Sequence, residues 1–127
     1  MGATPERQFR TVPIIPPIEK VRGQLTREMS DFVNAMEQFF ADEWPTIDRH
    51  LQSWKLYHDE SKSQYLRQAD ALRAMANQYH DLVQDIRTNP EMYDRKQLED
   101  ERTLLREAKH YALTGFDTLR RILPRGA

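Results

Sequence analysis

The sequence predicts an all-α protein: an elongated antiparallel three-helix bundle with coiled-coil-like packing and an extended proline-rich N-terminal arm. Apolar side chains recur at helical spacing over most of the chain, and prolines fall where these periodic segments end. The 127 residues suffice for one such domain. We expect the arm over residues 1–16 and the bundle over residues 17–124, with helices at about 17–43, 46–88 and 91–123.

The stretch 46–88 carries the strongest helical pattern and contains no proline or glycine. Apolar residues held at an average spacing of 3.5 indicate a coiled-coil-like helix, which buries a single stripe against partner helices. His58 and Ser61 interrupt this stripe, and we interpret them as a polar layer that fixes helix register. Read in sevens, the two core positions hold Leu51, His58, Tyr65, Leu72, Tyr79 and Ile86, and Trp54, Ser61, Gln68, Met75 and Leu82.

Prolines mark the ends of the flanking helices. Pro17 suits the first turn of a helix, and the residue before a proline disfavours helical backbone, so we expect chain reversals at Trp44-Pro45 and Asn89-Pro90. The second reversal would place Tyr65 opposite Gly115 in the last helix.

A reversal at Trp44-Pro45 has a consequence for the far end of the bundle. The first helix would then cover residues of about 45–72 and leave residues 73–89 facing the last helix alone. Contiguous apolar patches on soluble proteins usually bind something. We therefore expect a contact surface for a protein partner or a second copy, formed by Met75, Tyr79, Leu82, Val83 and Ile86.

The N-terminal arm offers a second candidate contact. Arg10, Pro13 and Pro16 fit the Arg-x-x-Pro-x-x-Pro pattern that SH3 grooves bind as a preformed polyproline helix. The alternatives are that the arm packs on its own bundle or on another chain of an assembly.

Few residues suggest chemistry. Glu107 and His110 match the Glu-x-x-His pair of bundle metal sites, but the sequence has no second such pair. The chain has no cysteine, which excludes disulfides and thiolate metal sites and fits a cytoplasmic or other reducing compartment. We expect no catalytic residue, no cofactor and no metal.

Charge and hydropathy restrict the partners further. The net charge of −1 is unlike that of a basic nucleic-acid-binding domain, and no apolar run has the length of a membrane span. The sequence therefore favours a protein–protein interaction module, an adaptor or a small structural subunit of a larger assembly. A helical enzyme or metal-binding bundle is one alternative, and a helical protein associated with a membrane surface or with nucleic acid is another.

Overall fold

The structure is a computed structural model that describes residues 15–55 and 58–124. The described residues form four α-helices and no strand, so the all-helical class is confirmed. The helices are α2 (Ile18–Asp42), α3 (Trp44–Gln52), α4 (Asp59–Thr88) and α5 (Arg95–Arg120), with a short 3-10 turn, η2 (Pro90–Met92), between the last two.

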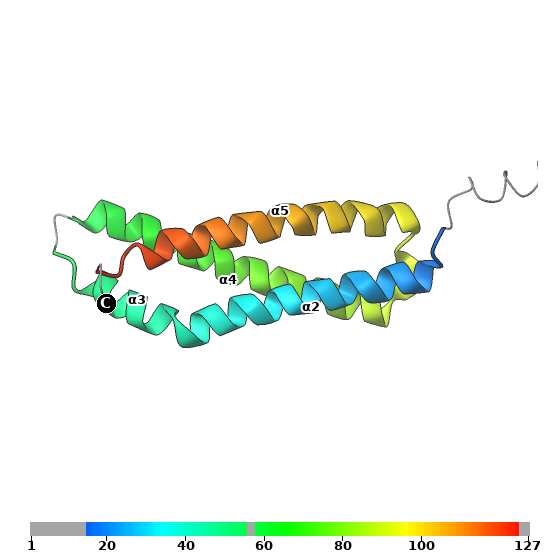
Figure 1. The fold of residues 1–127 in the computed structure, drawn as a ribbon, viewed down its shortest axis with the longest axis horizontal. Helices are drawn as coiled ribbons and strands as arrows, with labels where there is room; N and C mark the ends of the chain where they lie inside the picture. The colour runs from blue at the N-terminus through cyan, green and yellow to red at the C-terminus, as the bar shows by residue number, and fades with distance from the viewer. Residues whose placement is uncertain (1–14, 56–57, 125–127) are drawn as a thin grey trace, which may run out of the picture.

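The helices pack into an elongated bundle (Figure 1). α2 and α3 follow one another along its length as one kinked rod, α4 runs back beside them, and α5 returns in the direction of α2. The expected count of three helices is therefore wrong, because the stretch assigned to one central helix divides between α3 and α4.

Trp44-Pro45 kinks the first rod but does not reverse the chain. Glu43 keeps helical dihedral angles (φ −106°, ψ −44°). Its N–H donates to the Phe39 carbonyl at 2.9 Å, and its own carbonyl accepts from Ile47 N–H at 3.3 Å, so helical hydrogen bonds cross the kink. Pro45 lies in the first turn of α3, where its missing N–H would have no helical partner.

The first reversal lies instead between α3 and α4, and the expected helix over 46–88 is wrong at residues 53–55 and 58. The Ser53 hydroxyl donates to the His50 carbonyl at 2.6 Å and competes with continued helix at the end of α3. A continuous helix would also have placed only polar His58 and Ser61 on its stripe between Trp54 and Tyr65. The two aromatic rings close this end by packing edge to face, with centroids 5.6 Å apart.

Because α2 and α3 form one rod, α2 reaches the second half of α4. The Phe32 ring packs edge to face on Tyr79, with centroids 5.5 Å apart. Further along the bundle, Arg87 Nη2 donates to the Ser30 hydroxyl at 3.3 Å. The expectation that residues 73–89 face the last helix alone is therefore wrong.

The turn between α4 and α5 is held by side chains. The Asp85 carboxylate accepts hydrogen bonds from the Tyr93 hydroxyl and from Asn89 Nδ2. The hydrogen bond to Asp85 raises the pKa of Tyr93 to about 12, and the two donors lower the pKa of Asp85. Asp94 and Gln97 then form a capping box that begins α5 at Arg95, four residues after the expected start at about residue 91.

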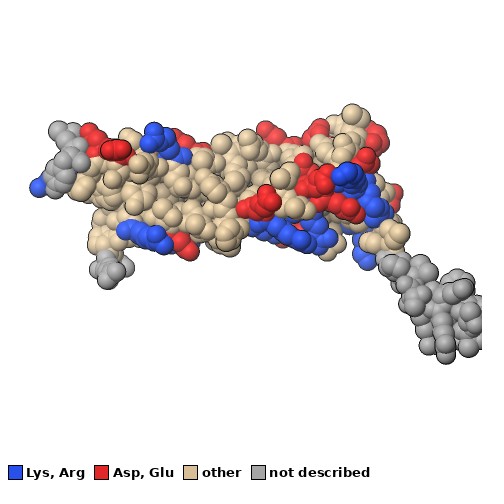
Figure 2. All heavy atoms as spheres, turned by 90° about the horizontal axis from the view of Figure 1, so that it is seen from above, with Lys and Arg blue, Asp and Glu red and all other residues tan. Residues whose placement is uncertain are grey.

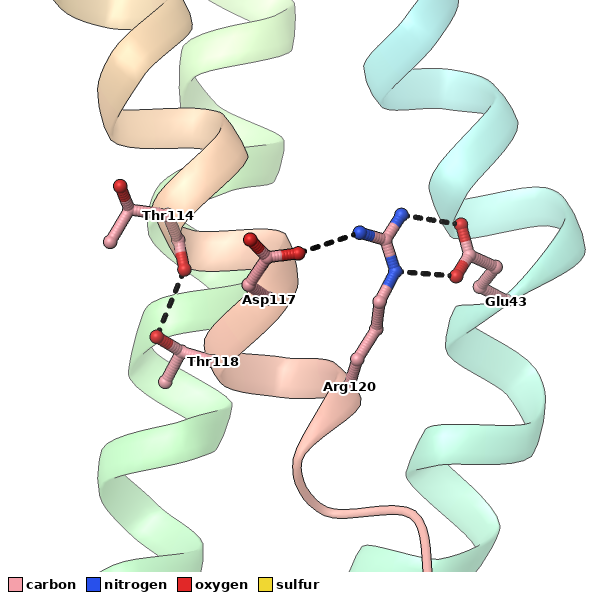
Figure 3. Close-up of polar contacts among 5 residues, drawn as sticks. All are labelled: Glu43, Thr114, Asp117, Thr118 and Arg120. Atoms are coloured by element: carbon pink, nitrogen blue, oxygen red, sulfur yellow. Dashed lines mark hydrogen bonds and ion pairs between the residues drawn. The ribbon is translucent and has the colours of Figure 1, made fainter. Parts of the chain in front are cut away.

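An ion pair joins the C-terminal end of α5 to the kink between α2 and α3 (Figure 3). Arg120 Nε and Nη2 donate to the two Glu43 carboxylate oxygens at 2.7 and 2.9 Å, and Nη1 donates to Asp117 at 3.0 Å. The guanidinium also lies 5.6 and 5.9 Å from the ring centroids of Phe39 and Phe116. The hydrogen bond to Arg120 lowers the pKa of Glu43, and the same bond raises the pKa of Arg120.

We expect the Glu43–Arg120 pair to be measurable despite its partial exposure. In a double-mutant cycle with Glu43→Gln and Arg120→Gln, the coupling should be about 0.5–1 kcal/mol near neutral pH. Because the folded-state pKa of Glu43 lies below 4.5, its contribution is fully present above pH 4.5 and declines as the pH falls through the lowered pKa. Denaturant unfolding at several pH values tests this, and a coupling that persists in strong acid would contradict it.

Gly115 is a close-approach position, and the atoms nearest to it belong to Gln68 and Leu72 rather than to the expected Tyr65. A Cβ built on Gly115 would lie 2.8 Å from Gln68 Nε2 and 3.2 Å from Leu72 Cδ1. Gly115→Leu should therefore overpack the α4–α5 contact and lower the free energy of unfolding by about 1–3 kcal/mol.

Gly23 supplies the matched control, since a Cβ on this helical glycine meets nothing within 4 Å. Gly23→Leu should raise the free energy of unfolding by about 0.5–1 kcal/mol through helix propensity. Thermal or denaturant unfolding compares the two variants, and equal effects would contradict the close approach at Gly115.

Candidate interaction surfaces

Three large apolar side chains are exposed along α5. Leu104, Tyr111 and Leu113 are 50 %, 43 % and 63 % exposed. At 3.6 residues per turn, Leu104 and Tyr111 share one flank of the helix, and Leu113 points to the opposite flank. The bundle therefore presents two apolar surfaces, one beside α4 and one beside α2.

The first surface lies between α4 and α5, and we call it the α4–α5 strip: Met75, Leu82, Leu104 and Tyr111. Its alignment follows from the hydrogen bond that Gln68 Nε2 donates to the Tyr111 hydroxyl at 3.2 Å. Seven residues further along each antiparallel helix, Met75 comes level with Leu104. Met75 and Leu82 are partly buried against the core, so the strip continues the core outwards.

Two glutamates lie beside the α4–α5 strip. Glu101 and Glu107 lie three residues before and after Leu104, on the same side of α5. Burial raises the pKa of Tyr79, and the charges of Glu101 and Glu107 raise it further. Burial raises the pKa of Glu101, and the charge of Asp100 raises it further. In the described part of the chain neither glutamate forms an ion pair, so the strip is a negatively charged apolar surface.

The second surface is a groove of about 280 Å³, which we call the α2–α5 groove. Buried Phe32, Ala112 and Phe116 form its floor, and Leu113 stands on its rim. The full lining is Glu28, Asp31, Phe32, Ala35, Lys109, Ala112, Leu113 and Phe116, with the acids on α2 and the lysine on α5.

One stretch of α5 carries little charge. Residues 110–116 include no Asp, Glu, Lys or Arg. Figure 2 shows the molecule of Figure 1 from above. Uncharged residues form a continuous area left of centre, and charged side chains gather mainly around it and toward the right-hand end.

Of the apolar residues expected to bind a partner, Tyr79, Val83 and Ile86 are buried inside the bundle, and Met75 and Leu82 are partly buried. The reasoning that residues 73–89 lack a second covering helix is wrong, because α2 packs on Tyr79 and reaches Arg87. A glutamate at Val83, which is 3 % exposed, would have to be buried and would unfold the bundle rather than probe its surface.

The arm is described only from Ile15 onwards, so Arg10 and Pro13 lie outside the described residues. Pro16 is exposed, and its carbonyl accepts a hydrogen bond from Arg95 Nη2 at 2.6 Å. This bond ties the start of α2 to the start of α5. The SH3-ligand pattern of the arm stays a prediction.

The pattern-based reading missed Leu104, Tyr111 and Leu113, which lie off the stripe formed by Leu98, Leu105, Ala112 and Leu119. A signal was present, since large apolar residues outside a narrow stripe must either widen the core or remain exposed. A wider core would need a further helix packed on α5. Of the described helices, only α2 and α4 pack on it along this stretch, so these side chains remain exposed.

Glu107 and His110, the candidate metal pair, are both exposed on α5. Across residues 15–55 and 58–124, no group of three or more histidine or acidic side chains is placed to hold a metal ion. In the same part of the chain, no helix combines the length and apolar character that crossing a membrane requires. Comparisons with models of protein families, with curated proteins and with solved structures gave no match to this chain.

Proposed function

We propose that this chain is a protein–protein interaction module, an adaptor or small structural subunit, that binds a partner along the α4–α5 strip. The observation that carries the proposal is the continuity of exposed Leu104 and Tyr111 with partly buried Met75 and Leu82. Full burial of a side chain of this size contributes about 1.5–3 kcal/mol, so covering the strip favours association.

The shape of the strip favours a helical partner. Its members repeat at seven residues on both α4 and α5, which matches the spacing at which an amphipathic helix presents one apolar face. Glu101 and Glu107 beside Leu104 favour lysine or arginine at the edges of that face, because opposite charges across an interface speed association and select the partner.

Adding negative charge to the strip should remove binding without disturbing the fold. Leu104→Glu and Tyr111→Glu replace exposed apolar groups with a carboxylate beside Glu107, so the new charges meet no buried surface in the isolated chain. Each should weaken partner binding by roughly 30-fold or more, the effect expected at a central contact. Affinity capture from the native source with quantitative mass spectrometry identifies the bound proteins, and titration with the purified partner measures the loss.

Ala41→Glu is the matched control, since Ala41 is exposed on α2 and takes no part in either surface. Circular dichroism should show equal helicity for all three variants. If every captured protein is retained by both strip variants, the α4–α5 strip is not the contact surface.

A further inference from the structure

The α2–α5 groove has edges of opposite charge, and one acid of its α2 edge, Glu28, already pairs with Arg102 of α5 at 4.0 Å. Asp31 lies on its α2 edge, and Lys109 lies on its α5 edge with Arg106 one turn away. None of these three forms an ion pair with another described residue. An acidic edge, an apolar floor and a basic edge therefore follow one another across this face.

Leu113 adds an exposed apolar side chain beside the groove. It is the most exposed of the large apolar side chains on α5, and it lies one turn from Lys109 on the same flank. The floor of Phe32, Ala112 and Phe116 beside it offers apolar surface of the kind that an external leucine would fill.

We propose that the occupant of this groove is a second copy of the chain, related by a twofold axis that runs along the groove, parallel to α2 and α5. α2 and α5 run parallel within one copy, so such an axis lays α5 of each copy alongside α2 of the other, with the two helices parallel. The basic edge of each copy then faces the acidic edge of the other, and each Leu113 meets the other copy's apolar floor.

The charge pattern selects this occupant. A uniformly basic partner helix would be repelled by Lys109 and Arg106 on the α5 edge. A uniformly acidic partner helix would be repelled by Asp31 on the α2 edge. A second copy presents both signs in the reversed order and satisfies both edges at once. This inference goes beyond the proposed function: the α4–α5 strip lies on the opposite flank of α5, so the dimer keeps two strips open.

Sedimentation equilibrium of the purified full chain tests the dimer without any partner. The mass should rise with concentration towards twice the chain mass of 15.1 kDa. Leu113→Glu should remain monomeric throughout, whereas Met92→Glu, an exposed apolar position in the turn before α5, should associate as the unaltered chain does. A mass that stays at that of one chain, or an unaffected Leu113→Glu dimer, overturns the proposal.

Charge reversal tests the twofold arrangement itself. Lys109→Glu and Asp31→Lys should each weaken self-association at least about tenfold, because both edge pairs then carry like charges. A mixture of the two variants should recover dimers, because in the mixed dimer each edge again faces the opposite sign. Repair within a single chain cannot explain recovery on mixing, and failure to recover overturns the pairing of each basic edge with the other copy's acidic edge. The strip is unchanged in these variants, so loss of the dimer and loss of partner binding are distinguishable.

Discussion

The packing of α2 against the second half of α4 is the contact on which the rest of this structure depends. Phe32 on Tyr79 and Ser30 on Arg87 set the alignment of the two helices, and both contacts exist because the chain stays helical through Glu43. Had the chain reversed at Trp44-Pro45, α2 would end beside the first half of α4. The core would then stop short of Val83 and Ile86, which are buried in the observed bundle.

This alignment also decides where apolar surface remains. With α2 covering one side of α4, the large apolar side chains left exposed on the four described α-helices are those on the two flanks of α5. One flank combines Leu104 and Tyr111 with two glutamates that pair with no described residue, and the other combines Leu113 with a groove whose edges carry opposite signs. The two surfaces therefore differ in the partner that they favour, even though they share a helix.

Local sequence rules predicted the helical class, a first helix starting at about residue 17, where α2 begins at Ile18, and the break at Asn89-Pro90. They did not distinguish a kink from a reversal at Pro45, because a proline in the first turn of a helix is compatible with either. That difference depends on whether Glu43 keeps helical dihedral angles, which tertiary contacts such as the Glu43–Arg120 pair help to determine. Polar His58 and Ser61, read as a register layer, instead lie at the reversal.

The candidate surfaces could be predicted only in part for the same reason. Met75 and Leu82 belong to the expected contact set and remain at the edge of the core, but Leu104 and Tyr111 became candidates only once the position of α2 was known. Periodicity identifies which face of a helix is apolar. It does not identify how many neighbours that face has, because this depends on where the chain reverses.

The most direct measurement of the central claim is a nuclear Overhauser spectrum of the full chain with assigned aromatic side chains. The structure predicts strong cross-peaks between the ring protons of Phe32 and Tyr79, whose centroids lie 5.5 Å apart. A reversal at Trp44-Pro45 would instead bring Phe32 to the level of His58. Cross-peaks from Phe32 to that part of the chain, with none to Tyr79, would contradict the observed arrangement of α2 and α4.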